Sequence, residues 1–323
     1  MTDDLSQEKL RDLASRWMGS TGSSFRFEVH TDTTDFFGID YNHIVVIDGR
    51  PYLIRQNTKE GRFGVDDEVK YWVKRAIDLS SDERVIIKLV FHETFMAQVG
   101  GIEFECFRSP KKEARILKLV ADHPNFMHGR SAEDDKGNVV RVLEYIYGPT
   151  LAAQVLNLEM AHERYFHEAF PGILDRFLPC IEGIRFLHDQ GEKHGDIRRD
   201  HIIVDRETED YRWIDFDYNY RHRENIYGYD LFGLGNILIY LTGKGDLLVN
   251  DLSKRNDPVL DDLTEDDINI VFNNRVANLK KIFPYIPDSL NLVLLHFSRG
   301  ARWYYENAGQ LLEDLRTARE DLR

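Results

Sequence analysis

The sequence contains only two cysteines, Cys106 and Cys180, among its 323 residues, and they do not form a CxxC pair. This low number and wide spacing exclude a disulfide framework and a zinc site built from cysteines. They are typical of proteins that work in a reducing compartment. We therefore expect a cytoplasmic protein.

The sequence also lacks a long hydrophobic run. The longest apolar stretch, roughly residues 231–241, contains glycine and asparagine and is shorter than the ~18 residues that a membrane helix needs. The first ten residues carry acids, where a secretory signal would begin with basic residues. We expect no membrane span and no targeting signal.

Basic residues are scarce relative to acidic ones. The chain has 42 Lys and Arg against 56 Asp and Glu, which gives a formal net charge of −14. So acidic a chain repels the phosphates of nucleic acids and anionic membrane surfaces, and we expect neither as a main partner. Hydrophobic residues make up 42% and charged residues 30%, as in folded globular proteins, and the length suffices for two lobes.

Three zones follow one another along the chain. Residues 1–40 contain one predicted helix, 6–18, and form an N-terminal helical extension. Residues 41–147 are mainly strands, interrupted by one predicted helix at 111–123. Residues 148–323 are mostly helical, because apolar residues recur there at three- and four-residue steps. The pattern predicts an α+β fold with a small β-rich lobe followed by a larger helical lobe.

The strongest chemical signal is HGDIRRDHIIVD at 194–205, followed by IDFD at 214–217. Asp196 and Asp215 stand at the two edges of a short predicted hairpin. Two carboxylates brought together in this way can divide the work, since one can accept a proton while the other holds a divalent cation. The alternative interpretation is a polar hairpin with incidental acids.

These two motifs resemble the catalytic loop H-x-D-x-x-x-x-N and the metal motif D-F-G of the protein-kinase-like superfamily. The resemblance implies a bilobal fold with ATP between the lobes, Asp196 as the catalytic base and Asp215 as a magnesium ligand. Arg198 stands where Ser/Thr-type kinases carry a lysine that contacts the transferred phosphate. His201 replaces the metal-binding Asn, which implies a ligand for Mg²⁺ or Mn²⁺; alternatively, His201 hydrogen-bonds the catalytic-loop backbone.

Two charged residues upstream extend the resemblance. Lys88 ends the strand RVIIK, which is similar to the family's V-A-I-K strand and implies contact with the α- and β-phosphates of ATP. Glu113 resembles the glutamate of the family's helix C, and an ion pair with Glu113 would hold Lys88 in position. Glu103 and Glu105 are less favoured partners.

Two further segments resemble the nucleotide-binding parts of the family. KEGRFGV at 59–65 resembles a glycine-rich loop that lacks its first glycine, and the resemblance implies that Gly61 and Gly64 approach phosphates; the alternative is an ordinary turn. In VVRVLEYIYGPTL at 139–151, backbone groups from Glu144 to Ile146 would bind adenine. The alternative is a core strand that ends in a Gly-Pro turn.

The departures from the family pattern bear on the substrate. Asp217 replaces the Gly of D-F-G, Gly195 replaces an Arg, and only residues 218–229 separate Asp217 from Asp230. HGD and IDFD are common among aminoglycoside, choline and lipopolysaccharide-sugar kinases, so the chain resembles an atypical, prokaryotic-style kinase. YDLFGLG at 229–235 resembles the family helix whose buried Asp, here Asp230, anchors the catalytic-loop backbone.

Two functions remain open. The resemblance implies an ATP-dependent transfer of phosphate to a hydroxyl; Arg198 favours a protein Ser/Thr acceptor, and the short segment favours a sugar or another small molecule. The alternative is a pseudokinase, a nucleotide-binding scaffold or regulatory module. It is suggested by the substitutions in the catalytic motifs.

Overall fold

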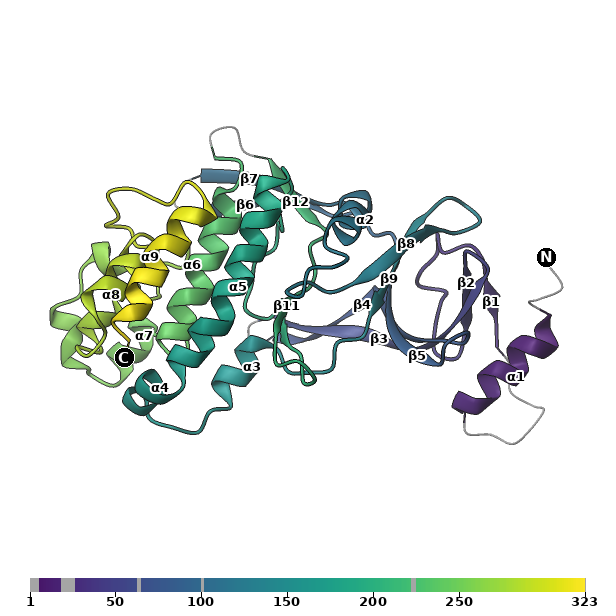
Figure 1. The fold of residues 1–323 in the computed structure, drawn as a ribbon, viewed down its shortest axis with the longest axis horizontal. Helices are drawn as coiled ribbons and strands as arrows, with labels where there is room; N and C mark the ends of the chain where they lie inside the picture. Colours follow the sequence, from purple (N-terminus) through teal and green to yellow (C-terminus); the bar gives the residue numbers. More distant parts are fainter. Residues whose placement is uncertain (1–5, 19–26, 63–64, 100–101, 222–224, 323) are drawn as a thin grey trace. The chain divides into compact units, whose positions relative to one another are not determined.

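The computed structural model describes residues 6–18, 27–62, 65–99, 102–221 and 225–322. The chain has the predicted α+β fold, with a β-rich N-terminal region and a helical C-terminal region (Figure 1). It divides into two compact units. The first unit comprises Met1–His92, Ser109–Asp122 and Met127–Tyr145, and the second comprises Glu93–Arg108, His123–Phe126 and Ile146–Arg323. The predicted boundaries at residues 40 and 147 stay a prediction.

The first unit is built on a seven-stranded sheet. Its strands, in spatial order, are β1 (Val29–His30), β2 (Ile44–Ile47), β3 (Arg50–Arg62), β4 (Val65–Asp78), β5 (Glu83–Lys88), β9 (Val139–Glu144) and β8 (Gly129–Glu133). Only the β1–β2 pair is parallel among these described strands. The predicted turn between β2 and β3 is confirmed, since Asp48 and Gly49 have φ values of 52° and 71°.

Both faces of this sheet are covered by apolar side chains. The predicted N-terminal helix is confirmed as α1 (Gln7–Met18), which Ser6 caps by accepting a hydrogen bond from the Lys9 N–H. Because side chains alternate along a strand, β3 contributes to two separate clusters. One cluster joins α1 to the sheet through Leu10, Ala14, Ile44, Leu53, Ile77 and Leu79. The other contains Tyr52, Ile54, Ala76, Val85, Ile87 and Val142 among its members.

The helix α2 (Pro110–Leu119) carries the predicted helix-C glutamate. Ser109 caps it by accepting a hydrogen bond from the Lys112 N–H, and Pro110 occupies the first turn, where no backbone donor is needed. The helix ends at Leu119 rather than at the predicted residue 123. His123 precedes a proline, and this position disfavours helical backbone angles.

The second unit is mainly helical. Its α-helices are α3 (Leu151–Leu156), α4 (His162–Glu168), α5 (Phe170–Asp189), α6 (Gly228–Thr242), α7 (Val249–Lys254), α8 (Asp288–Leu295) and α9 (Ala308–Glu320). Helices α5, α6 and α9 run alongside one another in Figure 1. Among the described residues, no helix has both the length and the apolar character needed to span a membrane.

Two small sheets complete the second unit. β10 (Ile202–Val204) and β11 (Tyr211–Trp213) form the predicted hairpin. β6 (Thr94–Val99) and β7 (Ile102–Arg108) form a second hairpin, to which β12 (Tyr218–Arg221) adds through β7. The β6–β7 hairpin, which lies between β5 and α2 in the sequence, thus pairs with β12, the segment directly after IDFD.

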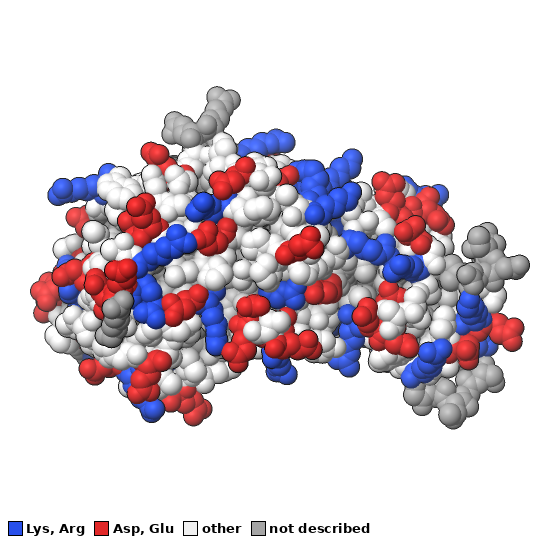
Figure 2. Space-filling view, in the orientation of Figure 1, with Lys and Arg blue, Asp and Glu red and all other residues white. Residues whose placement is uncertain are grey.

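Acidic and basic side chains are interspersed over the face of the molecule in Figure 2. The view therefore shows no broad basic surface of the kind that tracks a nucleic-acid backbone.

Candidate active site

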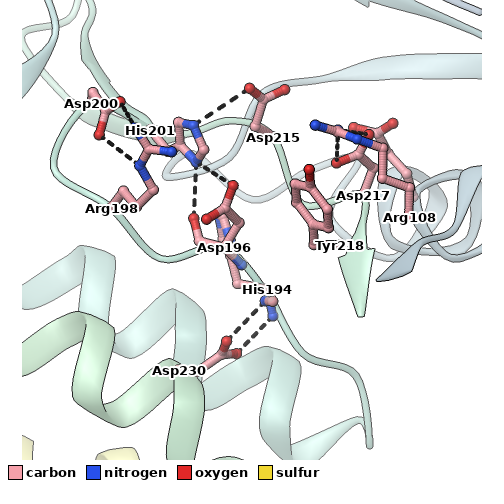
Figure 3. Close-up of polar contacts among 12 residues, drawn as sticks. Arg108, His194, Asp196, Arg198, Asp200, His201, Asp215, Asp217, Tyr218 and Asp230 are labelled. Carbon is pink, nitrogen blue, oxygen red and sulfur yellow. Dashed lines mark hydrogen bonds and ion pairs between the residues drawn. The ribbon is translucent and has the colours of Figure 1, made fainter. Parts of the chain in front are cut away.

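The loop that carries Asp196 is anchored by a buried carboxylate. Asp230, on α6, is fully buried and accepts hydrogen bonds from the N–H groups of His194 at 2.8 Å and Gly195 at 2.9 Å. His188, on α5, lies 3.1 Å from the same carboxylate. Figure 3 shows the contact between Asp230 and His194. The predicted anchoring by Asp230 is confirmed. Gly195 has a φ of 87°, a left-handed conformation that favours glycine.

The hairpin β10–β11 brings Asp215 beside the loop that carries Asp196. Ile202 pairs with Trp213, and one step further the Ile214 N–H donates to the carbonyl of His201 at 2.9 Å. Asp215 follows directly and has a φ of 61°. A left-handed backbone costs a residue other than glycine about 1 kcal/mol, and such strain persists mainly at functional sites.

His201 lies between the two aspartates (Figure 3). Its Nδ1 is 2.9 Å from the backbone oxygen of Asp196 and 3.5 Å from a carboxylate oxygen of the same residue. Its Nε2 is 3.6 Å from Oδ2 of Asp215. A carbonyl can only accept a hydrogen bond, so the neutral ring carries its proton on Nδ1 and leaves a lone pair on Nε2. The two interpretations of His201 are therefore compatible, because Nδ1 holds the loop while Nε2 faces Asp215.

The environment of Asp196 changes its acidity. Burial raises the pKa of the Asp196 carboxyl above its ordinary value, and the charges of Asp215 and Asp217 raise it further. His201 and Arg198 act in the opposite direction and lower it. A carboxylate with a raised pKa is a stronger base, which suits the role of proton acceptor implied by the sequence.

Arg198 forms a local ion pair. Its Nε and Nη2 donate to the two carboxylate oxygens of Asp200, at 3.1 and 2.6 Å. This bidentate geometry fixes the plane of the guanidinium and compensates part of its charge. The predicted contact of Arg198 with a phosphate stays a prediction.

In the first unit, Lys88 and Glu113 form the predicted ion pair. Nζ of Lys88 is 2.8 Å from Oε1 of Glu113, and both side chains are almost fully buried. Sequence reasoning missed a third member, Arg141 on β9, whose Nε donates to Oε2 of Glu113 at 3.0 Å. The sequence did offer a signal for this third member, because Arg141 interrupts the otherwise apolar strand VVRVL. A charged residue that is buried in such a strand needs a partner of opposite charge. Glu103 and Glu105, the less favoured partners, both lie on β7.

The remaining nucleotide-binding predictions fall on β3 and β9. Gly61 lies in β3 at an irregularity of the β3–β4 pairing between Glu60 and Arg62, a common site for glycine. Gly64 lies outside the described residues. The Glu144 N–H donates to the carbonyl of His128 at 3.0 Å within the sheet, and Ile146 follows β9 by two residues. Their contacts with phosphate and adenine stay predictions.

A buried ion pair next to Asp215 was also missed. Arg108, at the end of β7, contacts Asp217 and Glu93, and its guanidinium lies 4.0 Å from the centroid of the Tyr218 ring. The substitution of Asp217 for the family's glycine was visible in the sequence, but its partner was not. The two residues are 109 positions apart and meet because β7 pairs with β12.

No family model matches the chain, but several proteins are similar to about half of it. It is 28% identical over 173 residues to the 2-5A-dependent ribonuclease of Mus musculus, covering 50% of this chain and 22% of that protein. It is 21% identical over 153 residues to calcium-dependent protein kinase 27 of Arabidopsis thaliana, covering 47% and 28%. It is 25% identical over 180 residues to ribosomal protein S6 kinase alpha-2 of Homo sapiens, covering 55% and 21%. The match therefore takes in less than a third of each of these relatives.

Proposed function

We propose that this chain, whose similarity to protein kinases supports a place in the protein-kinase-like superfamily, is an ATP-dependent phosphotransferase that moves the γ-phosphate to a hydroxyl group. The observation that carries the proposal is the arrangement of Asp196 and Asp215 on either side of His201. Phosphoryl transfer needs little covalent chemistry from the protein, since positioning and charge neutralisation supply most of the catalysis.

Asp196 is the proposed proton acceptor. Its loop is held by the hydrogen bonds from His194 and Gly195 to Asp230, so its carboxylate has a defined position. The raised pKa increases its basicity toward the acceptor hydroxyl. Arg198, two residues further along the loop, is the proposed contact of the transferred phosphate.

Asp215 and His201 fit a divalent cation. Oδ2 of Asp215 and Nε2 of His201 are 3.6 Å apart, close to the ~3 Å between neighbouring ligands around an octahedral ion with bonds of about 2.1 Å. When bound, such a cation would neutralise charge on the phosphates of ATP. A carboxylate suits Mg²⁺ and Mn²⁺, and an imidazole favours the softer Mn²⁺.

Lys88 is the proposed phosphate contact of the first unit. Two buried cations, Lys88 and Arg141, contact the carboxylate of Glu113. Clustered cationic side chains favour an anionic ligand such as a phosphate. Glu144 and Ile146 keep their proposed contacts with adenine, and Gly61 and Gly64 theirs with the phosphates.

The pseudokinase alternative is favoured by one specific observation. Asp217, in place of the glycine of the metal motif, is held in a buried ion pair with Arg108. Such a pair restricts the backbone beside Asp215 to one conformation. A scaffold needs a fixed conformation and no turnover, so this alternative predicts nucleotide binding without transfer.

A thermal titration combined with a transfer assay tests the proposal. ATP with Mn²⁺ or Mg²⁺ should raise the Tm, because a ligand that binds the native state stabilises it. Labelled ATP should then pass its γ-phosphate to a component of a protein lysate or of a metabolite pool, which identifies the acceptor class. Stabilisation without transfer would favour the scaffold, and neither stabilisation nor transfer would overturn both functions.

A further inference from the structure

Three potential metal ligands meet at one edge of the sheet of the first unit, and none of them belongs to the motifs used above. Strand β1 pairs in parallel with β2, with Val29 opposite Ile44 and His30 opposite Val45. The Ile44 N–H donates to the carbonyl of Glu28 at 2.8 Å, so this register continues to Glu28 and His43. Because side chains alternate along a strand, Glu28, His30 and His43 fall on the same side of the two strands.

The ligand atoms of these three residues are close together. Nε2 of His30 lies 2.9 Å from Nδ1 of His43 and 3.8 Å from Oε2 of Glu28. One ligand atom from each residue lies within 4.8 Å of the others. The two imidazole rings are nearly parallel, inclined by only 17°, and their centroids are 5.0 Å apart.

We propose that Glu28, His30 and His43 bind one Zn²⁺ ion, with two imidazole nitrogens and one carboxylate oxygen as ligands. Tetrahedral zinc with bonds of about 2.0–2.1 Å places neighbouring ligand atoms roughly 3.3 Å apart. The two observed separations at His30, 2.9 and 3.8 Å, differ from this value by about half an ångström, which small side-chain rotations remove. A fourth position is left for water.

The hydrogen bonds of the two imidazoles are compatible with metal binding. The Asp40 N–H lies 3.3 Å from Nδ1 of His43, which therefore acts as an acceptor, and His30 donates the proton of the short contact between the rings. Zinc would take the place of that proton. His30 would then carry its proton on Nδ1, so both rings remain neutral, and His43 would give up the long bond from Asp40.

Carboxylates outnumber cations among the charged groups that act on His30. Glu28 and Asp35 bring negative charge toward His30, while Lys74 brings one positive charge. Lys74 is itself held by the carbonyl oxygens of Phe36 and Ile39. The carboxylates of Glu28 and Asp35 would offset part of the positive charge of a bound divalent cation. Lys74 offsets part of the negative charge of these two carboxylates.

The consequence would be structural. Strand β1 has only two residues and lies at the edge of the sheet, so few backbone hydrogen bonds hold it. A zinc ion would join β1 to β2 and would close the twelve residues, 31–42, between His30 and His43 into a cross-linked loop. The zinc ion would stabilise the folded state, because it binds the folded chain in preference to the unfolded one. This stabilisation does not depend on phosphotransfer.

Zinc binding to the full chain tests the proposal. The test uses a chain with Asp215→Ala, because Asp215 is a proposed ligand of another cation, and the protein is first treated with a chelator. Calorimetric titration with Zn²⁺ should give one site per chain, and Zn²⁺ should raise the Tm by several degrees. Loss of an outer-sphere partner costs about 10–100-fold in metal affinity, so His43→Ala should weaken binding by at least that factor.

Two further variants keep the result interpretable. Glu28 is exposed, so Glu28→Gln should leave the fold intact while it weakens Zn²⁺ binding by roughly tenfold. His92 is an exposed histidine of the same unit, and His92→Ala should leave the affinity unchanged. Absence of a saturable site, an affinity unaffected by both ligand variants, or an equal loss in His92→Ala would overturn the proposal.

Discussion

Arg108 donates from Nη1 to both carboxylate oxygens of Asp217, at 3.0 and 2.9 Å, although 109 positions separate the two residues. Both side chains are buried, and Arg108 also donates from Nε to Glu93 at 2.9 Å. Burial opposes the charge of Arg108, but Asp217, Tyr218 and Glu93 outweigh it and raise the pKa of the guanidinium. Arg108 therefore stays protonated, and its contact with Asp217 fixes the backbone two residues after Asp215.

Breaking this pair should loosen the segment that carries Asp215. Asp217→Asn leaves a buried cation with one carboxylate fewer, and we expect it to lower the free energy of unfolding by about 3 kcal/mol. It should also weaken metal-dependent ATP binding, because Asp215 loses its support. Urea denaturation and ATP-induced thermal shifts measure the two effects.

The matched control is an exposed pair on the second unit. Glu168→Gln removes the partner of Arg164 on α4 and should change the free energy of unfolding by less than about 1 kcal/mol. The double variant Arg108→Met with Asp217→Asn should recover part of the lost stability, since it leaves no buried unpaired charge. Equal effects of Asp217→Asn and Glu168→Gln would contradict the assignment.

Glu113 should matter more than its single charge suggests, because it serves two cations. Glu113→Gln leaves Lys88 and Arg141 buried without their carboxylate and should lower the free energy of unfolding by about 3–5 kcal/mol. For ATP affinity, losses from Glu113→Gln and Lys88→Met should be strongly non-additive, since the two residues act as one unit. Glu103→Gln, an exposed change on β7, is the control. Strictly additive losses would mean that Glu113 does not position Lys88.

Asp196→Asn tests the proton acceptor. The amide has nearly the same shape but cannot accept a proton, so turnover should fall by about 10²–10⁴-fold while ATP-induced stabilisation is kept. Phosphate transfer from labelled ATP gives the rate, and the thermal shift gives the binding. Asp210→Asn, in the exposed turn of the β10–β11 hairpin, should leave both unchanged. Turnover close to that of the unmodified protein would rule Asp196 out as the base.

His201→Asn separates the two tasks proposed for this ring. As a ligand through Nε2, His201 should favour Mn²⁺, so the variant should gain activity with Mg²⁺ relative to Mn²⁺. An Asn amide can still donate to the Asp196 carbonyl, which preserves the hold on the loop. Steady-state rates with each metal provide the measurement. An unchanged metal preference would leave His201 with the loop-binding role alone.

Acid should weaken the first unit through Asp134. Burial alone would raise the pKa of this carboxyl, but hydrogen bonds from Thr33 and Asn138 outweigh burial and lower it to about 2. A carboxylate whose pKa is lower in the folded state stabilises the fold above pH ~4, and this contribution disappears as the pH falls toward 2. The difference from the ordinary value of 3.8 corresponds to about 2 kcal/mol.

Denaturation curves between pH 2 and 5 measure this contribution. Asp134→Asn should remove stability at pH 5 and should flatten the pH dependence in this interval. Asp135→Asn, an exposed neighbour, should keep the slope of the unmodified chain. An identical slope in the Asp134→Asn variant would show that other groups govern the acid response.

Local sequence signals were sufficient for most secondary structure and for the order of the motifs. The turn at Asp48–Gly49 and the start of α2 at Pro110 each depend on backbone preferences that act within a few residues. The neighbourhood of His201 and Asp215 was likewise predictable, because both flank one short hairpin. Resemblance to the superfamily added the pairing of Lys88 with Glu113, which periodicity alone does not contain.

Only the tertiary structure decided which distant charges meet. A strand can pair with any compatible edge, and nothing in residues 93–108 or 218–221 specifies that β7 pairs with β12 and joins Arg108 to Asp217. The same holds for the parallel pairing of β1 with β2, which assembles Glu28, His30 and His43. Sequence therefore determined most elements and the order of the motifs, whereas long-range strand pairing determined the ion pair beside Asp215 and the proposed zinc site.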